Sequence, residues 1–279
     1  MFNDRVTVIG SGNMGTSLVA GLISTGFTSS HVTISDPDKS KLLALQKKFH
    51  VNISTDNTEA ANTADCIILA VKPQEMRSVA TALAPLVQMK KPLLISIAAG
   101  IHESQLQRWL GGNIAIVRCM PNMPALIRCG ASALYANTFV SSEQRKQAES
   151  ILSAISSIVW LEEESQMDAV TALSGSGPAY VFLLIEMLQE AGKTMGLSED
   201  IAGKLTRQTV YGAARMVLES TESAKALRIK VTSPGGTTEA AIHQLEQNKI
   251  RDIVTHALQA AKKRSEELAQ LVEEETKSS

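Results

Sequence analysis

"RVTVIGSGNMG", residues 5–15, places a short run of β-branched residues directly before a glycine-rich turn. The β-branched residues favour a strand, and residues 13–25 then carry apolar side chains at helical spacing. Gly10, Gly12 and Gly15 stand at the junction in the pattern G-x-G-x-x-G. A strand that runs through this pattern into a helix is typical of the first turn of a dinucleotide-binding fold.

The three glycines have different physical roles in such a turn. Gly10 permits the tight turn, Gly12 lets a pyrophosphate approach the backbone, and Gly15 lets the helix pack closely on the strand. The helix N-terminus then stabilises the charge of the phosphate. We therefore expect a bound dinucleotide at this turn.

The choice between two dinucleotides depends on the residues after the second predicted strand. Asp36 stands at about the spacing where an acidic side chain bonds the adenosine ribose, which favours NAD. Ser35, Lys39 and Lys41 lie close enough in the sequence to meet a 2′-phosphate instead, or to be ordinary solvated residues. The sequence leaves this choice open.

Strands and helices alternate through the first part of the chain. We expect helices over 13–25 and 39–49 and strands over 5–10, 31–35, 51–54, 65–71, 93–98, 114–119 and 132–136. Such alternation predicts an α/β fold with a largely parallel sheet covered on both faces. After about residue 163 almost every stretch favours helix, so we predict one domain over 1–163 and an all-helical domain over 164–279.

The helical half has apolar residues around much of the circumference of its predicted helices 179–194 and 200–219. Such helices must bury more than one face, and a subunit interface would bury the additional face. We expect breaks in the helical pattern at "SGSGP" (174–178), at "KTMGLSED" (193–200) and at a loop around 231–236. The charged tail 262–279 is expected to fray.

Composition excludes several classes of protein. The 279 residues have 44% hydrophobic content and a formal net charge of −1, so no overall charge attracts nucleic acid or an anionic membrane. Cys66, Cys119 and Cys129 form no C-x-x-C pair, and the five histidines have no metal-ligand spacing, which argues against a disulfide framework and a metal site. Residues 1–5 lack the features of a signal peptide, and apolar runs such as 66–71 are too short to span a bilayer. We expect a cytoplasmic protein.

Three further motifs are candidates for ligand binding. "AVKP" (70–73) follows a predicted strand at the ligand-binding rim of such a sheet, where Lys72 contacts a cofactor or is merely solvated. "RCMPNMP" (118–124) follows another strand, and its Asn122 either binds a ligand or belongs to a rigid turn. "SGSGPAY" (174–180) suits anion contact or close packing.

The loop "SPGGTT" (233–238) interrupts the helical half with two consecutive glycines. Gly235 and Gly236 have no Cβ, so a ligand can come close to their backbone N–H groups. Thr237 and Thr238 either contact the same ligand or cap the following helix.

Taken together, these motifs resemble those of the pyrroline-5-carboxylate reductase family over nearly the whole chain. The family resemblance is carried by "IGSGNMG", "AVKP", "SIAAG", "RCMPNMPALI", "DAVTALSGSGPAYVF", "MGL" and "VTSPGGTT". It implies a Rossmann-type N-terminal domain and a helical dimerisation domain, and reduction of 1-pyrroline-5-carboxylate to proline with NADPH or NADH. It also implies an interleaved homodimer, in some members a decameric ring of dimers, in which each active site uses both chains.

The resemblance also implies roles for individual residues. Thr238 would hydrogen-bond the ring nitrogen of the substrate, while backbone N–H groups of Gly235, Gly236 and Thr237 hold its carboxylate. The implied substrate-binding set is Ser233, Gly235, Gly236, Thr237, Thr238, Met120 and Asn122. The implied cofactor-binding set is Ile9, Gly10, Ser11, Gly12, Asn13, Met14, Gly15, Ser35, Asp36, Asn57, Ala70, Val71, Lys72, Pro73, Ala98 and Ala99.

The sequence departs from the family pattern in two places, and two other functions compete. Met123 stands where the family more often has threonine, and the segment 223–230 places Lys230 where a neutral residue is common. A β-hydroxyacid dehydrogenase would share the two-domain plan, but it places a catalytic lysine after its second glycine-rich motif, and residues 174–186 contain none. A dinucleotide sensor without catalysis is the other alternative.

Overall fold

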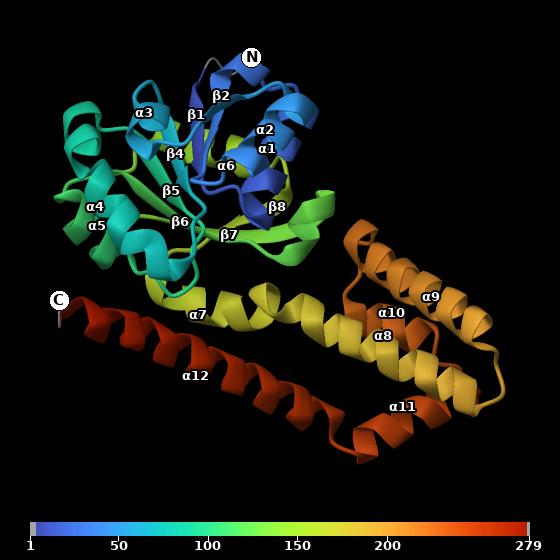
Figure 1. Cartoon of the computed structure of the whole chain (residues 1–279). Coiled ribbons are helices and arrows are strands. Elements are labelled where there is room, and N and C mark those ends of the chain that lie inside the picture. Colours follow the sequence, from blue (N-terminus) through green and yellow to red (C-terminus); the bar gives the residue numbers. More distant parts are fainter. Residues whose placement is uncertain (1–3, 278–279) are drawn as a thin grey trace. The chain divides into compact units, whose positions relative to one another are not determined.

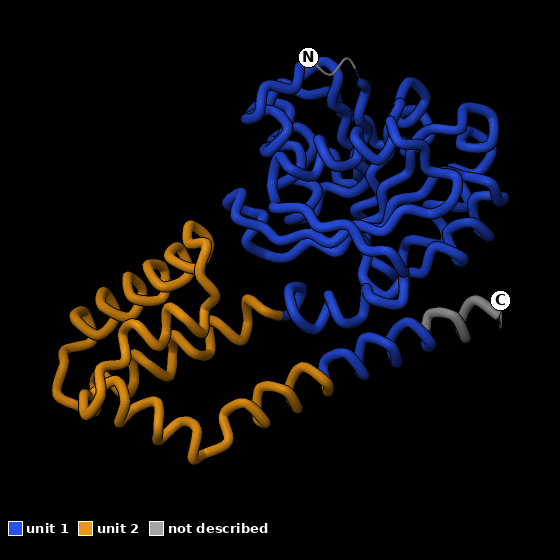
Figure 2. The backbone as a smooth tube through the Cα atoms, turned by 180° about the vertical axis from the view of Figure 1, so that it is seen from behind, with its two compact units in different colours: residues 1–176, 261–279 blue, residues 177–260 orange. Residues whose placement is uncertain are grey.

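The computed structural model describes the backbone of residues 4–277 and the side chains of 4–271. Part of the segment inspected for a signal peptide, residues 1–3, lies outside this range. The chain forms two compact units, one of residues 1–176 with 261–279 and one of residues 177–260 (Figure 2). These units divide the chain differently from the predicted boundary at 163/164, because the end of the last helix packs with the first unit.

Unit 1 is built on one sheet of eight strands (Figure 1). Their order across the sheet is β3-β2-β1-β4-β5-β6-β7-β8. The bounds are β1 Val6–Ile9, β2 Val32–Ser35, β3 Asn52–Ser54, β4 Cys66–Leu69, β5 Leu93–Ser96, β6 Ile116–Met120, β7 Gly130–Ala136 and β8 Ser156–Trp160. All seven predicted strands are present, and β1 to β6 are parallel as predicted.

The far edge of the sheet differs from the sequence expectation. β7 runs antiparallel to β6, and β8 pairs with β7 in parallel. β8 was not predicted. It lies at the edge of the sheet, and although Ile158, Val159 and Trp160 are apolar, only Ser156 of its five residues is buried.

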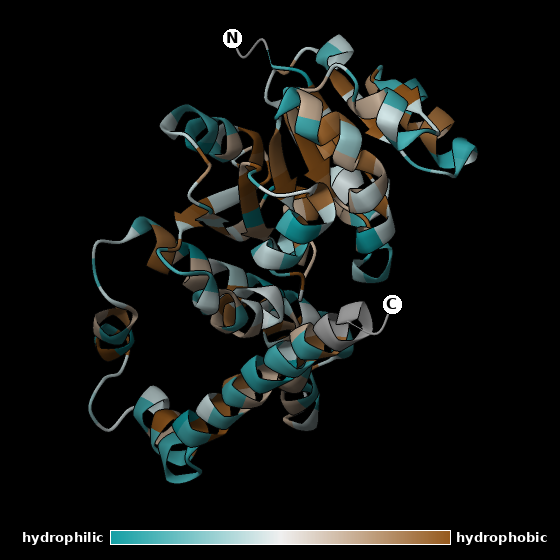
Figure 3. Cartoon of the chain, turned by 90° about the vertical axis from the view of Figure 1, so that its left-hand side faces the viewer, coloured by the Kyte–Doolittle hydropathy of each residue, from teal (hydrophilic) through white to brown (hydrophobic). Residues whose placement is uncertain are grey.

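Helices cover both faces of this sheet, as the alternating pattern predicted. They are α1 Asn13–Ser24, α2 Lys39–Phe49, α3 Asn57–Ala61, α4 Pro73–Lys90, α5 Glu103–Leu110 and α6 Ser142–Leu152, with short turns η1 Ser29–His31 and η2 Met123–Ile127. Side chains alternate along each strand, so Val8 faces the core under α1, α2 and α6, while Ile9 faces the core under α3, α4 and α5. Figure 3 shows the apolar strands between these helices.

One continuous helical run begins where the sheet ends. It comprises η3 Glu164–Gln166, α7 Met167–Val170, the π-helical turn η4 Thr171–Gly175 and α8 Gly177–Thr194. The predicted break at 174–178 is present as an irregularity within this run: the π-helical turn ends at Gly175, Ser176 is a bend, and α8 begins at Gly177. Pro178 therefore stands in the first turn of α8, where its missing N–H has no helical partner to lose. Met120 packs on Gly175, where a Cβ would lie 2.5 Å from the flexible end of that side chain, Cε.

This run is long and apolar enough to cross a membrane by length and composition, and 6% of its most apolar window is buried. The sequence prediction rested on uninterrupted apolar runs such as 66–71 and so did not consider this run, which small polar residues interrupt. The same composition suits a helix that is covered by another protein chain.

Unit 2 continues with α9 Glu199–Glu219, α10 Ala224–Lys230, α11 Thr237–Gln247 and the first part of α12 Ile250–Lys277. The break predicted at 193–200 is present at 195–198, and the one predicted around 231–236 is present as well. Large apolar side chains of α8 and α9 are exposed in this single chain, including Phe182 at 54%, Leu205 at 57% and Leu218 at 86%. Their exposure agrees with the prediction that these helices need a further partner surface.

The end of α12 is ordered against unit 1, so the prediction that the tail frays from residue 262 was wrong over its described side chains. Ser265 donates a hydrogen bond of 2.6 Å from Oγ to Oδ1 of Asp168. Ala269 is only 3% exposed. Lys262, Lys263 and Arg264 are exposed, whereas Ser265 and Ala269 are buried, so the charged composition of the segment hid this buried face.

Two glycines of the first turn give a test of the fold. A Cβ on Gly15 would overlap the carbonyl oxygen of Gly10, whereas a Cβ on Gly12 would meet nothing within 4 Å. We expect Gly15→Ala to lower the free energy of unfolding by at least about 2 kcal/mol, because backbone must move. Gly12→Ala should cost about 1 kcal/mol or less, as a poorer N-cap. Denaturant unfolding of both variants measures the difference, and equal costs would contradict the packing role of Gly15.

Candidate active site

The ends of three strands meet at the first glycine. Gly10 has φ +106°, and a Cβ there would lie 2.7 Å from the carbonyl oxygen of Ala70. Its N–H donates to the carbonyl of Ser35 at 2.8 Å, and the N–H of Ala70 donates to the carbonyl of Ile9 at 2.8 Å. These contacts bring the carboxyl ends of β1, β2 and β4 together, which is where ligands bind in such sheets.

Helix α1 begins directly at this edge with an open N-terminus. Gly12 is its N-cap residue, no side chain caps it, and its first turn has no acidic residue. The first N–H groups of a helix have no partner within the helix, and together with the helix dipole they attract an anion. The open space over Gly12 leaves room for a phosphate to reach them.

Asp36, just after β2, is held rigidly beside this turn. Its Oδ2 accepts the N–H of Ser11 at 2.8 Å, and its Oδ1 accepts the N–H of Asp38 at 2.9 Å. Burial raises the pKa of Asp36, but the hydrogen bonds from Ser11 and Asp38 and the charge of Lys41 together lower it below the ordinary value. Each carboxylate oxygen keeps a second lone pair, which can accept a ribose hydroxyl.

A cleft of about 520 Å³ lies along this edge. Nine predicted cofactor residues line it, namely Ile9, Gly10, Gly12, Ser35, Asp36, Asn57, Ala70, Val71 and Lys72. The predicted residues Ser11, Asn13, Met14, Gly15, Pro73, Ala98 and Ala99 do not. Sequence reasoning missed Pro37, Asp38, Thr55, Glu75, Ser78 and Val79, which also line the cleft and which follow the ends of β2, β3 and β4.

Polar contacts fix the end of the cleft near Asp36. Ser35 donates from Oγ to Oδ1 of Asn57 at 2.7 Å. Lys41, a candidate for binding a 2′-phosphate, pairs with Asp38 at 3.5 Å. Asp38 also caps α2 by accepting the N–H groups of Ser40 and Lys41. The charge of Lys41 is thus partly neutralised by Asp38, which makes Lys41 less available to a 2′-phosphate.

The loop after β5 reaches the same edge of the sheet. Ala98 is 8% exposed, and Ala99 is exposed. Ser96, the last residue of β5, has a buried hydroxyl that finds no partner among the described residues. An uncapped helix N-terminus, a rigid carboxylate and a spare hydroxyl at one edge fit a dinucleotide.

Asn122 serves a structural purpose at the turn after β6. Its Oδ1 accepts the N–H of Ala131 at 2.9 Å, and its Nδ2 donates to the carbonyl of Ser174 at 3.0 Å. Both ends of the amide are therefore occupied within unit 1, and Met120 beside it packs on Gly175. This geometry favours the rigid-turn interpretation of "RCMPNMP" and leaves substrate contact by these two residues a prediction.

The loop 231–236 has a defined conformation in unit 2. Gly235 has φ +72°, and its N–H donates to Oε2 of Glu239 at 2.7 Å. The N–H of Gly236 donates to the carbonyl of Ser233 at 3.0 Å. Two of the three N–H groups that were expected to hold a carboxylate, those of Gly235 and Gly236, are thus engaged within the loop and the start of α11.

Helix α11 starts on this loop. Gly236 is its N-cap residue, and no side chain caps it. Thr237 and Thr238 are its first two helical residues, so the alternative in which one of them caps the helix was wrong. Their N–H groups are the ones that a helix leaves free, and Thr238 is half-buried beside them.

The structure also shows the surroundings of Lys230 and of the side chains that could bind a metal. Lys230, which departs from the family pattern, pairs with Glu222 at 2.7 Å, so its charge is offset. No group of three or more metal-ligating side chains is found among the described residues.

Comparison with known proteins agrees with this geometry. Residues 164–268 match the family model described as pyrroline-5-carboxylate reductase dimerisation, and residues 5–100 match the model described as NADP oxidoreductase coenzyme F420-dependent. The pyrroline-5-carboxylate reductase of Pseudomonas aeruginosa is 47% identical over 97% of this chain and 98% of its own.

Solved structures are similar over the same length. A pyrroline-5-carboxylate reductase from Coxiella burnetii has a TM-score of 0.94 at 43% identity and covers 96% of this chain and 99% of its own. The enzyme of Plasmodium falciparum, solved with NADP bound, has a TM-score of 0.84 at 33% identity, with coverage of 96% and 99%. On this similarity, the chain belongs to the pyrroline-5-carboxylate reductase family.

Proposed function

We infer that this chain reduces 1-pyrroline-5-carboxylate to proline with NADPH or NADH. One observation supports the inference above all: each unit has a helix that begins on glycine without a side-chain cap, α1 at Gly12 and α11 at Gly236. One such helix suits the pyrophosphate of a cofactor and the other suits the carboxylate of a small substrate.

The residues of this chain bind and orient the substrate, whereas the hydride comes from the cofactor. When bound, the reduced nicotinamide supplies the hydride that reduces the imine carbon. The N–H groups of Thr237 and Thr238 hold the substrate carboxylate, in place of those of Gly235 and Gly236, which the loop already uses. The hydroxyl of Thr238 hydrogen-bonds the ring nitrogen, which favours its protonated and more electrophilic form.

The alternatives receive less support. A β-hydroxyacid dehydrogenase needs a lysine early in α8, where the first lysine is Lys193 near its end. A sensor without catalysis would not need the loop 231–236, whose conformation is fixed by the hydrogen bonds of Gly235 and Gly236. Reduction of the imine explains both the cleft in unit 1 and the loop in unit 2.

The partner for the apolar helices is a second copy of this chain. The match of residues 164–268 to a dimerisation model supports a homo-oligomer. We propose an interleaved homodimer, with a decameric ring of dimers as the larger assembly, and active sites that use both chains. We further propose a cytoplasmic enzyme that binds neither nucleic acid nor membrane, because its charge is nearly balanced and its cysteines are free.

The reaction can be tested directly with purified protein. Mixed with 1-pyrroline-5-carboxylate, it should oxidise both NADPH and NADH, which is followed by the absorbance of the reduced nicotinamide, and proline should form in equal amount. Cofactor binding without proline formation would instead favour the sensor.

Cofactor preference should depend on Asp36. Its negative charge repels a 2′-phosphate, so Asp36→Ala should raise the ratio of kcat/KM for NADPH to that for NADH about tenfold, or about 1.4 kcal/mol. Asp56→Ser is the control, because Asp56 caps α3 outside the cleft and serine retains the cap. A ratio that is unchanged in Asp36→Ala would mean that Asp36 does not contact the ribose.

Thr238 should act on catalysis and not on stability. Because it lies inside the first turn of α11 and is not its cap, Thr238→Ala should keep the melting temperature within a few degrees and bind reduced cofactor normally. The lost hydrogen bond should lower kcat at least about tenfold, or about 1.4 kcal/mol. Thr237→Ala, its exposed neighbour, is the control and keeps the N–H of residue 237. Wild-type kcat in Thr238→Ala would remove Thr238 from the reaction.

A further inference from the structure

We propose that Glu164 is a positioning residue for the loop 97–102 between β5 and α5, and that it thereby sets the affinity for the nicotinamide cofactor. The inference rests on the proposed function, because it assigns this loop to the cofactor. All the residues that carry it lie in unit 1.

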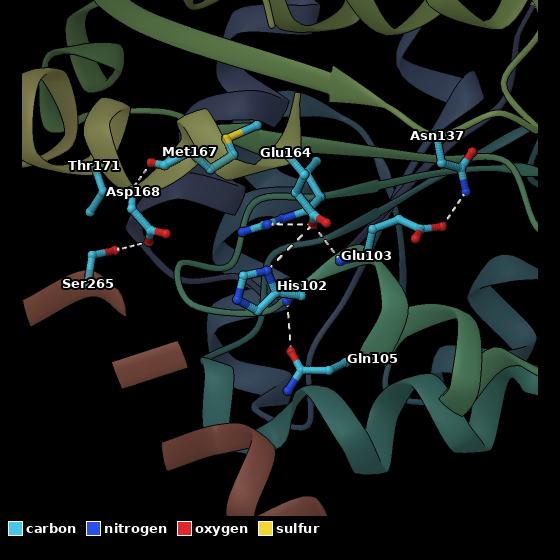
Figure 4. A network of polar contacts seen from close by, with 10 residues as sticks. His102, Glu103, Gln105, Asn137, Glu164, Met167, Asp168, Thr171 and Ser265 are labelled. Carbon is cyan, nitrogen blue, oxygen red and sulfur yellow. Dashed lines mark hydrogen bonds and ion pairs between the residues drawn. The ribbon is translucent and has the colours of Figure 1, made fainter. Parts of the chain in front are cut away.

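One oxygen of Glu164 gathers several groups from distant parts of the chain (Figure 4). Oε1 accepts a hydrogen bond of 2.5 Å from Nη1 of Arg118 and one of 2.6 Å from the N–H of Glu103. Nδ1 of His102 lies 3.9 Å from the same oxygen. The carboxylate thus connects β6 with the end of the loop and the start of α5.

Arg118 anchors this contact in the sheet. It is 6% exposed and stands in β6 in register with Ser96, the last residue of β5. A buried guanidinium needs a counter-charge, and Glu164 supplies it. Arg118 therefore fixes the position of Glu164, and Glu164 can fix the end of the loop through the N–H of Glu103.

Other contacts also hold the end of the loop. Oε1 of Glu103 accepts from Nδ2 of Asn137 at 2.6 Å, and Oε1 of Gln105 accepts the N–H of His102 at 2.7 Å. Gly100 has φ +74°, a conformation that favours glycine, and lies near α12, since a Cβ there would lie 3.9 Å from the backbone nitrogen of Ala269. The hydrogen bonds thus hold the loop at its end.

The held loop borders the proposed cofactor edge. It directly follows Ser96, whose buried hydroxyl has no partner among the described residues, so it starts at the edge where β4 and β5 both end. Ala98 in this loop does not itself line the cleft. A displacement of the loop by a fraction of an ångström would alter contacts to a ligand there, because bound geometry depends on such supporting residues. Glu164 would act through the loop without touching the cofactor.

The experiment must separate positioning from stability. Glu164→Ala leaves Arg118 buried and unpaired, so a loss of function alone could reflect poor folding. Glu164→Gln keeps an oxygen that can accept from Glu103 and Arg118. The double variant Arg118→Met with Glu164→Leu removes both charges, which restores stability but leaves the N–H of Glu103 without its acceptor. Glu162→Gln, two residues away and exposed, is the matched control for charge.

Each variant is titrated with NADPH and NADH by the fluorescence of the reduced cofactor, and its melting temperature and KM for 1-pyrroline-5-carboxylate are measured. We expect Glu164→Ala to weaken cofactor binding at least tenfold, Glu164→Gln by less than threefold, and Glu162→Gln not at all. The double variant should recover the melting temperature and still bind cofactor at least fivefold more weakly. The KM for the imine should stay within threefold throughout.

Recovery of cofactor affinity together with melting temperature in the double variant would overturn the proposal, as would wild-type affinity in a folded Glu164→Ala. Should Glu164→Ala not fold, the double variant decides alone. A wild-type chain that binds cofactor without reducing the imine would refute the proposed function only, and the affinities would still decide the role of Glu164.

Discussion

Helix α1 lies so close to the turn after β1 that no side-chain carbon fits at Gly15, and the arrangement of unit 1 depends on this contact. It directs the N-terminus of the helix at the edge where β1, β2 and β4 end. The N–H of Gly10 then bonds to the end of β2, and Ala70 bonds to the end of β1. A residue larger than glycine at position 10 or 15 would separate helix α1 from the strands that surround the cleft.

The two proposed binding sites follow the same physical rule in different surroundings. Both α1 and α11 begin on a glycine without a side-chain cap, so their first N–H groups are available to an anion. They differ in how they are held. Tight packing under Gly15 fixes α1, whereas the bond from Gly235 to Glu239 fixes the start of α11. The first site is thus part of the core, and the second is a short loop shaped by its own hydrogen bonds.

The sequence predicted the parts of the molecule whose signals are local. The strand, turn and helix at 5–25, Asp36 after β2 and the loop at 231–236 are each determined by residues close together in the chain. The contacts that the sequence did not predict join distant residues, because spacing says nothing about them. Asn122 bonds to Ser174, and Arg118 bonds to Glu164, across 52 and 46 residues.

The helical features that the sequence did not predict also depend on contacts between residues that are far apart in the chain. Ser265 and Ala269 are buried by contacts with unit 1, although the sequence around them is mostly charged. Met120 lies close to Gly175 across 55 residues, and no periodicity in either segment reports this contact. The predicted fraying of the tail followed local composition, and over the described side chains packing overrode it.

The apolar surface of α8 raises a choice between lipid and protein as its partner. A bilayer and a subunit interface both select long apolar helices, so length and composition alone do not separate them. Charge favours a protein partner, since Glu186, Glu190 and Lys193 all lie on α8, and charged side chains are expensive inside a membrane. Glu190 and Lys193 pair at 3.0 Å and are partly exposed, as at the rim of an interface that water reaches. A second copy of the chain, which can cover the apolar faces and leave these charges in water, satisfies both demands.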